Sequence, residues 1–380
     1  MTYRLPQRFE DEKPKNIMPL GPPTGFQYHG YDTAYGSMGD SAEDAVRGTN
    51  DSAVESRCSA VNLGYFKDEF VKFFTRRTER RPPIINRGSY ARFMGFDIFI
   101  NKFLEAGDMK KQIVVLGAGS DTKYFNLKKE NKQPYKFFEI DFPQITFKKI
   151  QTIKRSKQIS GLIGDFEINI GHTELYGQDY YIISEDLKNF TTKIVPKLEE
   201  HGFDKNLPTM FLSECVMIYM DPEHSDAIVQ WISENVPTSL IMAYEQILPN
   251  DAFGQMMIKN LKARNIELKG IDAYPDLEDQ KNRYLSRGWD QAFAININYF
   301  FNSHIDPSEY HRQMLIEIFD EIEEWKLIAQ HYCFAWAFNM KNEDYKFIFD
   351  DIKFPTYSLS IPKHALPKKI SSNDKMDVDN

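Results

Sequence analysis

The sequence has few cysteines and no long apolar run. Its three cysteines, Cys58, Cys215 and Cys333, are odd in number and widely spaced, which indicates neither a disulfide framework nor a cysteine-based zinc site. No segment reaches 18 consecutive apolar residues, and the first residues lack the apolar core of a signal peptide, so we expect no membrane partner. A reducing, cytoplasmic location is predicted, with an additional nuclear pool left open.

Positive charge is also scarce. Lysine and arginine number 47 against 55 acidic residues, which gives a net charge of −8. Because phosphate backbones are bound by basic surfaces, this net charge argues against general affinity for nucleic acid, and no nucleic-acid partner is expected. The stretch "RRTERRPPIINRGSYAR" is locally rich in arginine although the chain as a whole is acidic. Two interpretations of it stay open, solvated arginines or a nucleic-acid patch. Eight scattered histidines form no metal-binding motif, so no metal is expected.

Composition divides the chain into three parts. Residues 1–50 are rich in Gly, Pro, Ser and Asp without an apolar period and are predicted to be a disordered leader, as residues 363–380 are predicted to be a disordered tail. Residues 51–362 form a single predicted domain. Its expected parts are N-terminal helices over 51–110, a cofactor-binding core over 111–250, and a lid with C-terminal helix-strand units over 251–362.

From Gln112 onward, short apolar runs alternate with longer polar segments of helical spacing. This alternation predicts an α/β fold, a doubly wound, mostly parallel sheet with helices on both faces. The predicted strands are "QIVVLGAG", "YKFFEID", "YYIISEDL", "TMFLSEC", "SLIMAYEQ" and "HYCFAWAF". Helices are predicted over 52–77 with a break near Gly64, over 89–107 closed by Gly107, and over 316–329.

Ligands in such sheets lie at the carboxyl ends of the strands. The first strand ends in Gly117 and Gly119, whose bare backbone allows a ligand to approach closely, although a tight turn without a ligand is the alternative. The second strand ends in Glu139 and Asp141, where a carboxylate can accept both hydroxyls of a ribose. A plain surface acid is the alternative for either residue.

The choice of cofactor depends on what the glycine turn lacks. Thr122 occupies the place of the third glycine of a dinucleotide fingerprint, and the P-loop lysine is missing, which disfavours ligands held by a phosphate cradle. S-adenosylmethionine has a ribose and an adenine but no phosphate, so it fits. Asp186 and Leu187 could contact the adenine, or Asp186 could cap a helix.

The fourth and fifth strands add further candidates. Glu214 ends a run that should be buried, where an ionised group needs a partner or a ligand, and Tyr219 follows near the same cleft. Arg57 and Arg92 could supply a fixed positive charge for a carboxylate.

Eight segments resemble, in order and spacing, the leucine carboxyl methyltransferase family over about residues 50–340: "INRGSYAR", "VVLGAGSDT", "EIDFP", "EDL", "SECVMIYM", "YEQ", "DAFGQMMIKNL" and "HYCFAWA". The resemblance implies a class I S-adenosylmethionine-dependent methyltransferase fold with a substrate lid. It implies methyl esterification of the C-terminal leucine carboxylate of the type 2A protein phosphatase catalytic subunit. The cofactor contacts that it implies are Arg57, Arg92, Gly117, Asp141, Asp186, Leu187 and Glu214. The family position matching Arg57 can be lysine.

A carboxylate acceptor with a pKa near 3.5 is ionised at neutral pH and needs no general base. We therefore expect catalysis by positioning, with Arg92 orienting the carboxylates and Tyr219 or Tyr244 donating a hydrogen bond. Phe253, Met256 and Met257 could line a leucine pocket or form a core face. The folded phosphatase surface is expected to contribute to binding. A small-molecule carboxyl or hydroxyl methyltransferase, a non-catalytic phosphatase-tail binding module and an NAD-dependent oxidoreductase stay as alternatives.

Overall fold

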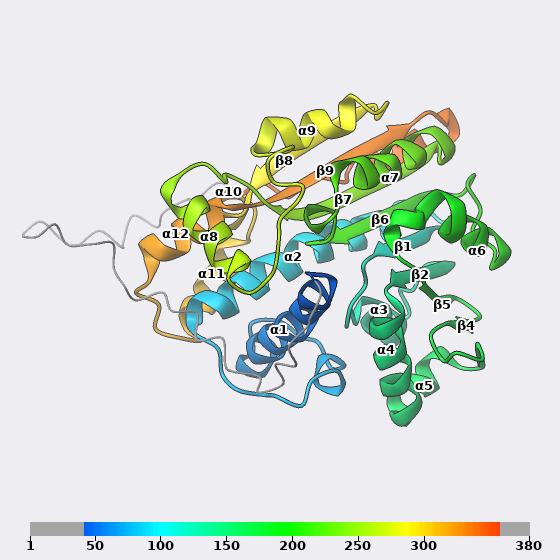
Figure 1. Ribbon diagram of the computed structural model, residues 1–380, viewed down its shortest axis with the longest axis horizontal. Helices are drawn as coiled ribbons and strands as arrows, with labels where there is room; N and C mark the ends of the chain where they lie inside the picture. Colours follow the sequence, from blue (N-terminus) through cyan, green and yellow to red (C-terminus); the bar gives the residue numbers. More distant parts are fainter. Residues whose placement is uncertain (1–41, 358–380) are drawn as a thin grey trace, which may run out of the picture. The chain divides into compact units, whose positions relative to one another are not determined.

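A nine-stranded sheet organises residues 42–357, the part of the chain that the computed structural model describes (Figure 1). The strand order is β3-β4-β5-β2-β1-β6-β7-β9-β8. Strands β5, β2, β1, β6 and β7 run parallel, whereas β9 is antiparallel to both β7 and β8. The predicted doubly wound, mostly parallel sheet is confirmed. The strands are β1 Gln112–Leu116, β2 Lys136–Asp141, β3 Phe166–Ile168, β4 Leu175–Gly177, β5 Tyr180–Ser184, β6 Thr209–Glu214, β7 Thr238–Gln246, β8 Gln291–Asn296 and β9 Tyr332–Met340.

Helices cover both faces of the sheet. The α-helices are α1 Ala42–Leu63, α2 Pro83–Glu105, α3 Lys123–Lys129, α4 Pro143–Arg155, α5 Lys157–Ile163, α6 Val195–Glu200, α7 Pro222–Asn235, α8 Ala252–Lys262, α9 Leu277–Leu285, α10 Ile297–Ser303, α11 Pro307–Met314 and α12 Ile322–Gln330. Short 3-10 segments are η1 Val71–Phe73, η2 Leu187–Asn189, η4 Met217–Tyr219 and η5 Glu343–Phe349, and η3 Phe190–Ile194 is a π-helical turn.

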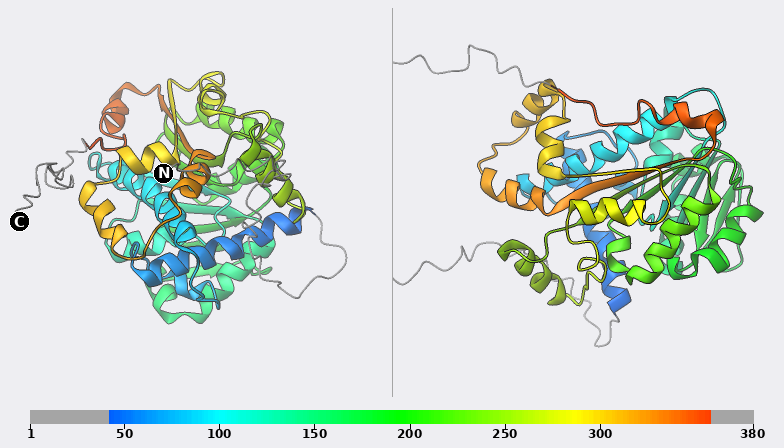
Figure 2. Two further views of the ribbon diagram at one scale, coloured as in Figure 1. Left: turned by 90° about the vertical axis from the view of Figure 1, so that its left-hand side faces the viewer. Right: turned by 90° about the horizontal axis from the view of Figure 1, so that it is seen from above.

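Alternate residues of each central strand enter two separate apolar cores. Ile113 and Val115 of β1 pack with α2, α3, α4, α5, α10 and α12 on one face, and Val114 and Leu116 pack with α6, α7 and α9 on the other. All five residues of β1 are buried, as expected for a strand covered on both sides. Figures 1 and 2 show the long helix α2 lying along the first face, with α1 packed beside it.

The N-terminal boundary differs from the prediction. Helix α1 begins at Ala42, so residues 42–50 are helical and their assignment to a disordered leader is wrong. Residues 1–41 and the predicted tail at 363–380 lie outside the described residues. The break near Gly64 is confirmed, since α1 ends at Leu63 and Gly64 has φ +88°. The predicted helical continuation beyond it is limited to the single turn η1.

Three further details escaped the sequence patterns. Strands β3 and β4 were not predicted and have only three residues each. Strand β8 was not predicted either, and it joins the sheet by pairing with β9. The predicted helix over 316–329 begins only at Ile322, because the carboxylate of Glu317 is buried against Asn86 and Tyr65. Within the described part, no helix is long and apolar enough to cross a membrane.

Candidate active site

The glycine turn after β1 is hydrogen-bonded to β2 and packed against the segment after β6. Both Gly117 and Ala118 donate backbone hydrogen bonds to the carbonyl of Ile140, at 2.9 and 3.0 Å. Gly117 has φ +70°, and a Cβ there would lie 2.5 Å from a methyl group of Val216. Gly119 has φ +54°. Backbone conformation and the space around the two glycines disfavour side chains in this turn, which fits both a tight turn and the predicted close approach of a ligand.

Asp141 lies directly against the glycine turn. One carboxylate oxygen accepts the backbone N–H of Gly119 at 2.6 Å, and the other accepts that of Phe142 at 2.7 Å. Burial raises the pKa of Asp141 to about 6, while the two N–H donors lower it. Each oxygen keeps a lone pair for a ribose hydroxyl, so the site fits the predicted ribose contact.

Glu139 does not belong to this site. Its side chain is 1% exposed, pairs with Lys149 of α4 and accepts a hydrogen bond from the Tyr180 hydroxyl at 2.8 Å. Of the two acids proposed for the ribose, only Asp141 is placed to contact it, since Glu139 is enclosed between the sheet and α4.

Glu214 ends β6 between two cations. One oxygen pairs with the guanidinium of Arg92 from α2, and the other accepts a hydrogen bond from the Lys123 amine at 2.9 Å. Burial alone would raise the pKa of Glu214, but Arg92, then Lys123 and Arg57, hold it well below its usual range. Of the two alternatives for this acid, a partner or a ligand, the structure shows partners within the chain, and the ligand contact stays a prediction.

Arg57 reaches the same cluster from α1. Its guanidinium forms an ion pair with Asp68 at 2.9 Å and lies over the ring of Phe93, 5.4 Å from its centre. The Nη2 atom is buried without a hydrogen-bond partner among the described residues. A buried donor without an acceptor is costly, and a cofactor carboxylate at this point would satisfy it.

Asp186 and Leu187 follow β5 beside Asp141. The backbone N–H of Glu185 donates to the carbonyl of Asp141 at 3.0 Å, which places the two strand ends together. The Asp186 carboxylate accepts the backbone N–H of Lys188 at 2.9 Å and caps η2, the alternative foreseen for it, yet it stays partly exposed. Leu187 is 7% exposed and packs with the core on the α6 and α7 side.

The two predicted tyrosines differ in setting. Tyr244 pairs with Glu214 in the β6–β7 register, lies 5.2 Å under the guanidinium of Arg92, and stacks on Tyr332 with ring centres 5.3 Å apart. Tyr219 ends η4 and packs against Ile218 in a small cluster with α8. The structure therefore brings Arg92, Glu214 and Tyr244 into contact and places Tyr219 against helix α8.

Helix α8 covers the turn after β6. Its N-terminus is capped by Asp251, which also contacts His331 at 2.9 Å. Met257 packs into the cluster with Tyr219, while Phe253 lies against the ring of His331, with ring centres 4.4 Å apart. Both therefore pack within the protein, whereas Met256 is 48% exposed and is the one of the three predicted pocket residues that faces solvent.

Sequence reasoning missed several residues of the site. Asp121 and Lys123 stand within the quoted glycine turn and its continuation, and their ion pair connects that turn to Glu214. Glu245 is the penultimate residue of the fifth predicted strand, is 1% exposed, and accepts the backbone N–H of Ile218 at 3.2 Å. The available signal was their position near the carboxyl ends of strands, with Asp121 and Lys123 in the segment that leads from β1 into α3 and Glu245 near the end of β7, because such positions converge at one edge of a parallel sheet. Asn50 falls in the segment predicted to be disordered.

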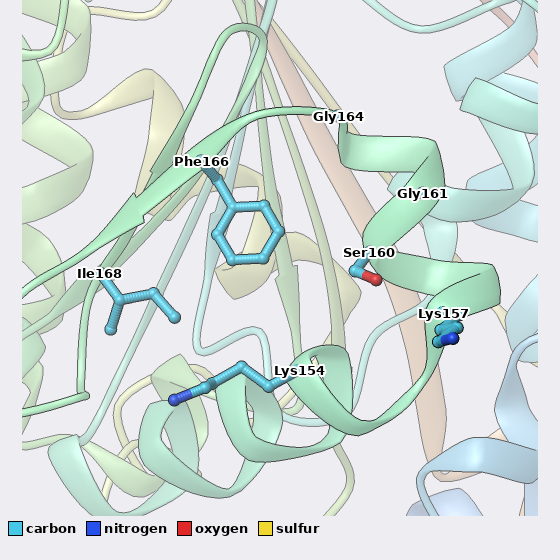
Figure 3. Close-up of a pocket in the computed structure, with 7 residues that line it drawn as sticks. All are labelled: Lys154, Lys157, Ser160, Gly161, Gly164, Phe166 and Ile168. Carbon is cyan, nitrogen blue, oxygen red and sulfur yellow. The ribbon is translucent and has the colours of Figure 1, made fainter.

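A separate cavity of about 500 Å³ lies between α4, α5 and β3. Figure 3 shows the side chains of Phe166 and Ile168 on one side of it and Lys154 on another. None of the predicted site residues lines it. Across residues 42–357, no group of three or more metal-ligating side chains is found.

The fold and the site together define a class of protein. Without its extra strands β3 and β4, the sheet has the order β5-β2-β1-β6-β7-β9-β8 with only β9 reversed, the arrangement of class I methyltransferases. The glycine turn follows β1 and Asp141 ends β2, at the carboxyl ends of the strands, where sheets of this kind bind their ligands. The orphaned donor of Arg57 fits a cofactor carboxylate.

Comparison with known proteins narrows the class to a family. The leucine carboxyl methyltransferase family pattern matches residues 40–233. A leucine carboxyl methyltransferase 1 homolog from Arabidopsis thaliana is 40% identical over 82% of this chain and 92% of its own length. The Schizosaccharomyces pombe leucine carboxyl methyltransferase 1 is 39% identical over 75% and 91%. The chain belongs to the leucine carboxyl methyltransferase family. It is an enzyme, a carboxyl methyltransferase, and its cofactor is S-adenosylmethionine, as predicted.

Two further proteins are more distantly similar to this chain. Human tRNA wybutosine-synthesizing protein 4 is 32% identical over 87% of this chain but only 49% of its own length. A DUF574 family protein from Streptomyces avermitilis aligns with a TM-score of 0.43 and 14% identity over 76% of this chain and 99% of its own. At this score, the structural likeness adds nothing to the family assignment.

Proposed function

We propose that this chain methylates the C-terminal leucine carboxylate of the type 2A protein phosphatase catalytic subunit. The family assignment gives a carboxyl group as the acceptor. The observation on this chain that supports the proposal is Arg92. Its guanidinium is held by Glu214, lies over Tyr244 at the carboxyl end of the sheet, and stays 28% exposed. A cation fixed in this way can meet a carboxylate arriving from solvent.

The residues of the site act by binding and orienting. S-adenosylmethionine, when bound, supplies an electrophilic methyl group on a sulfonium. The acceptor carboxylate, with a pKa near 3.5, is already ionised at neutral pH, so no side chain has to remove a proton. Arg92 orients the acceptor. Glu214 accepts a hydrogen bond from the Nε of Arg92 and thereby fixes the plane of the guanidinium. Holding the reacting atoms within about 3–3.5 Å of each other lowers the barrier to methyl transfer.

A tyrosine hydroxyl supplies a further hydrogen bond to the acceptor. Burial raises the pKa of both Tyr219 and Tyr244, so both hydroxyls are protonated at neutral pH and able to donate. Tyr244 is the better placed because it contacts Arg92. Loss of this donor costs transition-state stabilisation. A Tyr219→Phe, Tyr244→Phe double variant with full kcat would refute this role.

The folded phosphatase contributes to binding beyond its tail. Ordering a flexible peptide costs free energy that a few contacts do not offset, and helix α8 offers the exposed Met256 beside the site. We expect the free C-terminal peptide to react with a much lower kcat/KM than the folded subunit. Equal values for the two substrates would contradict this part of the proposal.

The test is transfer of labelled methyl from S-adenosylmethionine to the purified phosphatase catalytic subunit. The same subunit without its last leucine is the substrate control. Arg92→Ala is the enzyme variant, and Arg155→Ala, an exposed arginine at the end of α4, is its matched control. We expect a base-labile label on the intact subunit only, reduced at least about 100-fold with Arg92→Ala and unchanged with Arg155→Ala.

The same assay separates the alternatives. Label on small carboxylic acids but not on the phosphatase would favour a small-molecule methyltransferase. Binding of the phosphatase tail without any methyl transfer would favour a non-catalytic binding module. Either result would overturn the proposed substrate.

A further inference from the structure

The first half of helix α1 lies against the cofactor-binding turn. The side-chain amide oxygen of Asn50 accepts the backbone N–H of Ser120 at 2.7 Å, and its Nδ2 donates to the Ser120 hydroxyl at 3.1 Å. A Cβ on Gly119 would lie 2.6 Å from the same amide oxygen. Asn50 and Ser120 are 70 residues apart in the sequence, so this contact joins the N-terminal helix to the centre of the sheet.

Neighbouring residues of α1 contact the other side of the same site. The guanidinium of Arg47 lies 5.5 Å from the ring centre of Phe142, and its charge lowers the pKa of Asp141. The Asp51 carboxylate lies 4.0 Å from the Lys148 amine of α4. The helix therefore contacts both the glycine turn and the residues that follow β2.

Asn50 and Arg57 project from one face of α1. They are seven residues apart, which is two helical turns and about 10 Å along the axis. Arg57 reaches the charged cluster around Glu214, and Asn50 reaches Ser120. One face of α1 thus carries Arg57, the predicted contact of the cofactor's carboxylate, and Asn50, which reaches the glycine turn beside Asp141, the predicted ribose contact.

We propose that Asn50 is a positioning residue of the cofactor site and that α1 forms one wall of it. The Asn50 amide fixes the Ser120 N–H, and this holds the adjoining Gly119 N–H on Asp141, the ribose acid. Without the Asn50 amide, the backbone N–H of Ser120 has lost its hydrogen-bond acceptor. The turn can then rotate so that the Gly119 N–H moves away from Asp141. The ligand concerned is a nucleoside bearing an amino acid, and the inference rests on the cofactor alone, independently of the phosphatase.

The test measures binding of S-adenosylhomocysteine to the full chain by calorimetry, without any phosphatase. We expect Asn50→Ala to weaken binding about tenfold, a difference of about 1.4 kcal/mol. Ser56→Ala is the matched control on the same helix, because its hydroxyl bonds only to the Ser52 carbonyl of its own helix at 2.9 Å. The titrations are run at a temperature at which circular dichroism shows every variant to be fully folded.

Hydrogen exchange adds a measurement that a purely structural role would not change. In the wild-type chain, saturating S-adenosylhomocysteine should slow exchange of the α1 amides over 42–63, and in Asn50→Ala this slowing should be reduced in the half of the helix around residue 50. Wild-type affinity in Asn50→Ala overturns the proposal. Unchanged protection of α1 by the ligand in that variant overturns it as well. A chain that binds the cofactor as expected but does not methylate the phosphatase leaves this inference intact and refutes the proposed function instead.

Discussion

Replacing Gly117 by alanine tests whether the glycine turn is closed by the loop after β6. The added Cβ would lie 2.5 and 2.9 Å from the two methyl groups of Val216, and overpacking of this kind costs about 1–3 kcal/mol. The φ of +70° adds about 1–2 kcal/mol for a residue with a Cβ. We therefore expect Gly117→Ala to lower the free energy of unfolding by about 2–5 kcal/mol, the sum of these terms.

The double variant Gly117→Ala, Val216→Ala separates the two causes. Removing both methyl groups relieves the overlap but not the backbone strain, so urea denaturation should show a favourable coupling of about 1–3 kcal/mol between the two substitutions. Affinity for S-adenosylhomocysteine should fall in Gly117→Ala and recover in part in the double variant. Strictly additive destabilisation would show that Val216 does not close the turn and would refute the reasoning.

Three further predictions concern charge. Arg92→Ala leaves Glu214 with Lys123 as its hydrogen-bonding cation, and we expect a loss of about 1–3 kcal/mol of stability in urea denaturation; unchanged stability would contradict the ion pair. The pKa of Asp141 is raised to about 6, so the carboxylate becomes protonated, and loses acceptor capacity for the ribose hydroxyls, as the pH drops from 7.5 to 5.5. Calorimetry should show cofactor affinity falling over this range, and a constant affinity would show that Asp141 does not bind the ribose. Burial raises the pKa of Glu245 from 4.5 to about 7; its folded form therefore binds a proton that the unfolded chain releases, and its contribution to stability is lost as the pH rises from 5 to 8. Glu245→Gln should flatten that decline, and an identical slope would contradict it.

The central part of the site could be predicted from the sequence because parallel strands end at one edge. Gly117 follows β1, Asp141 ends β2 and Glu214 ends β6, and the structure brings the three to one edge of the sheet. Glu139 shows the limit of this reasoning. It stands two residues before Asp141, yet its side chain is buried against Lys149, and only the packing of α4 decides which of the two acids faces the ligand.

The N-terminal contribution could not be predicted from local composition. Residues 42–50 are polar and lack an apolar period, so their helix depends on contacts with distant segments, such as that of Asn50 with Ser120. Choosing Arg57 and Arg92 among many arginines required the family resemblance, because no local pattern marks an arginine that reaches a distant carboxylate. Tertiary contacts override composition at these positions.

The place of β9 in the sheet has a consequence for synthesis. Strand β8 pairs only with β9 within the described sheet, and β9 begins at Tyr332, well after β8 ends at Asn296. At about 5–20 residues per second, a ribosome needs about 2–7 s to make the intervening residues. During that interval one edge of β7 and both edges of β8 are unpaired, so chaperones have time to bind the C-terminal half of the nascent chain before the sheet closes.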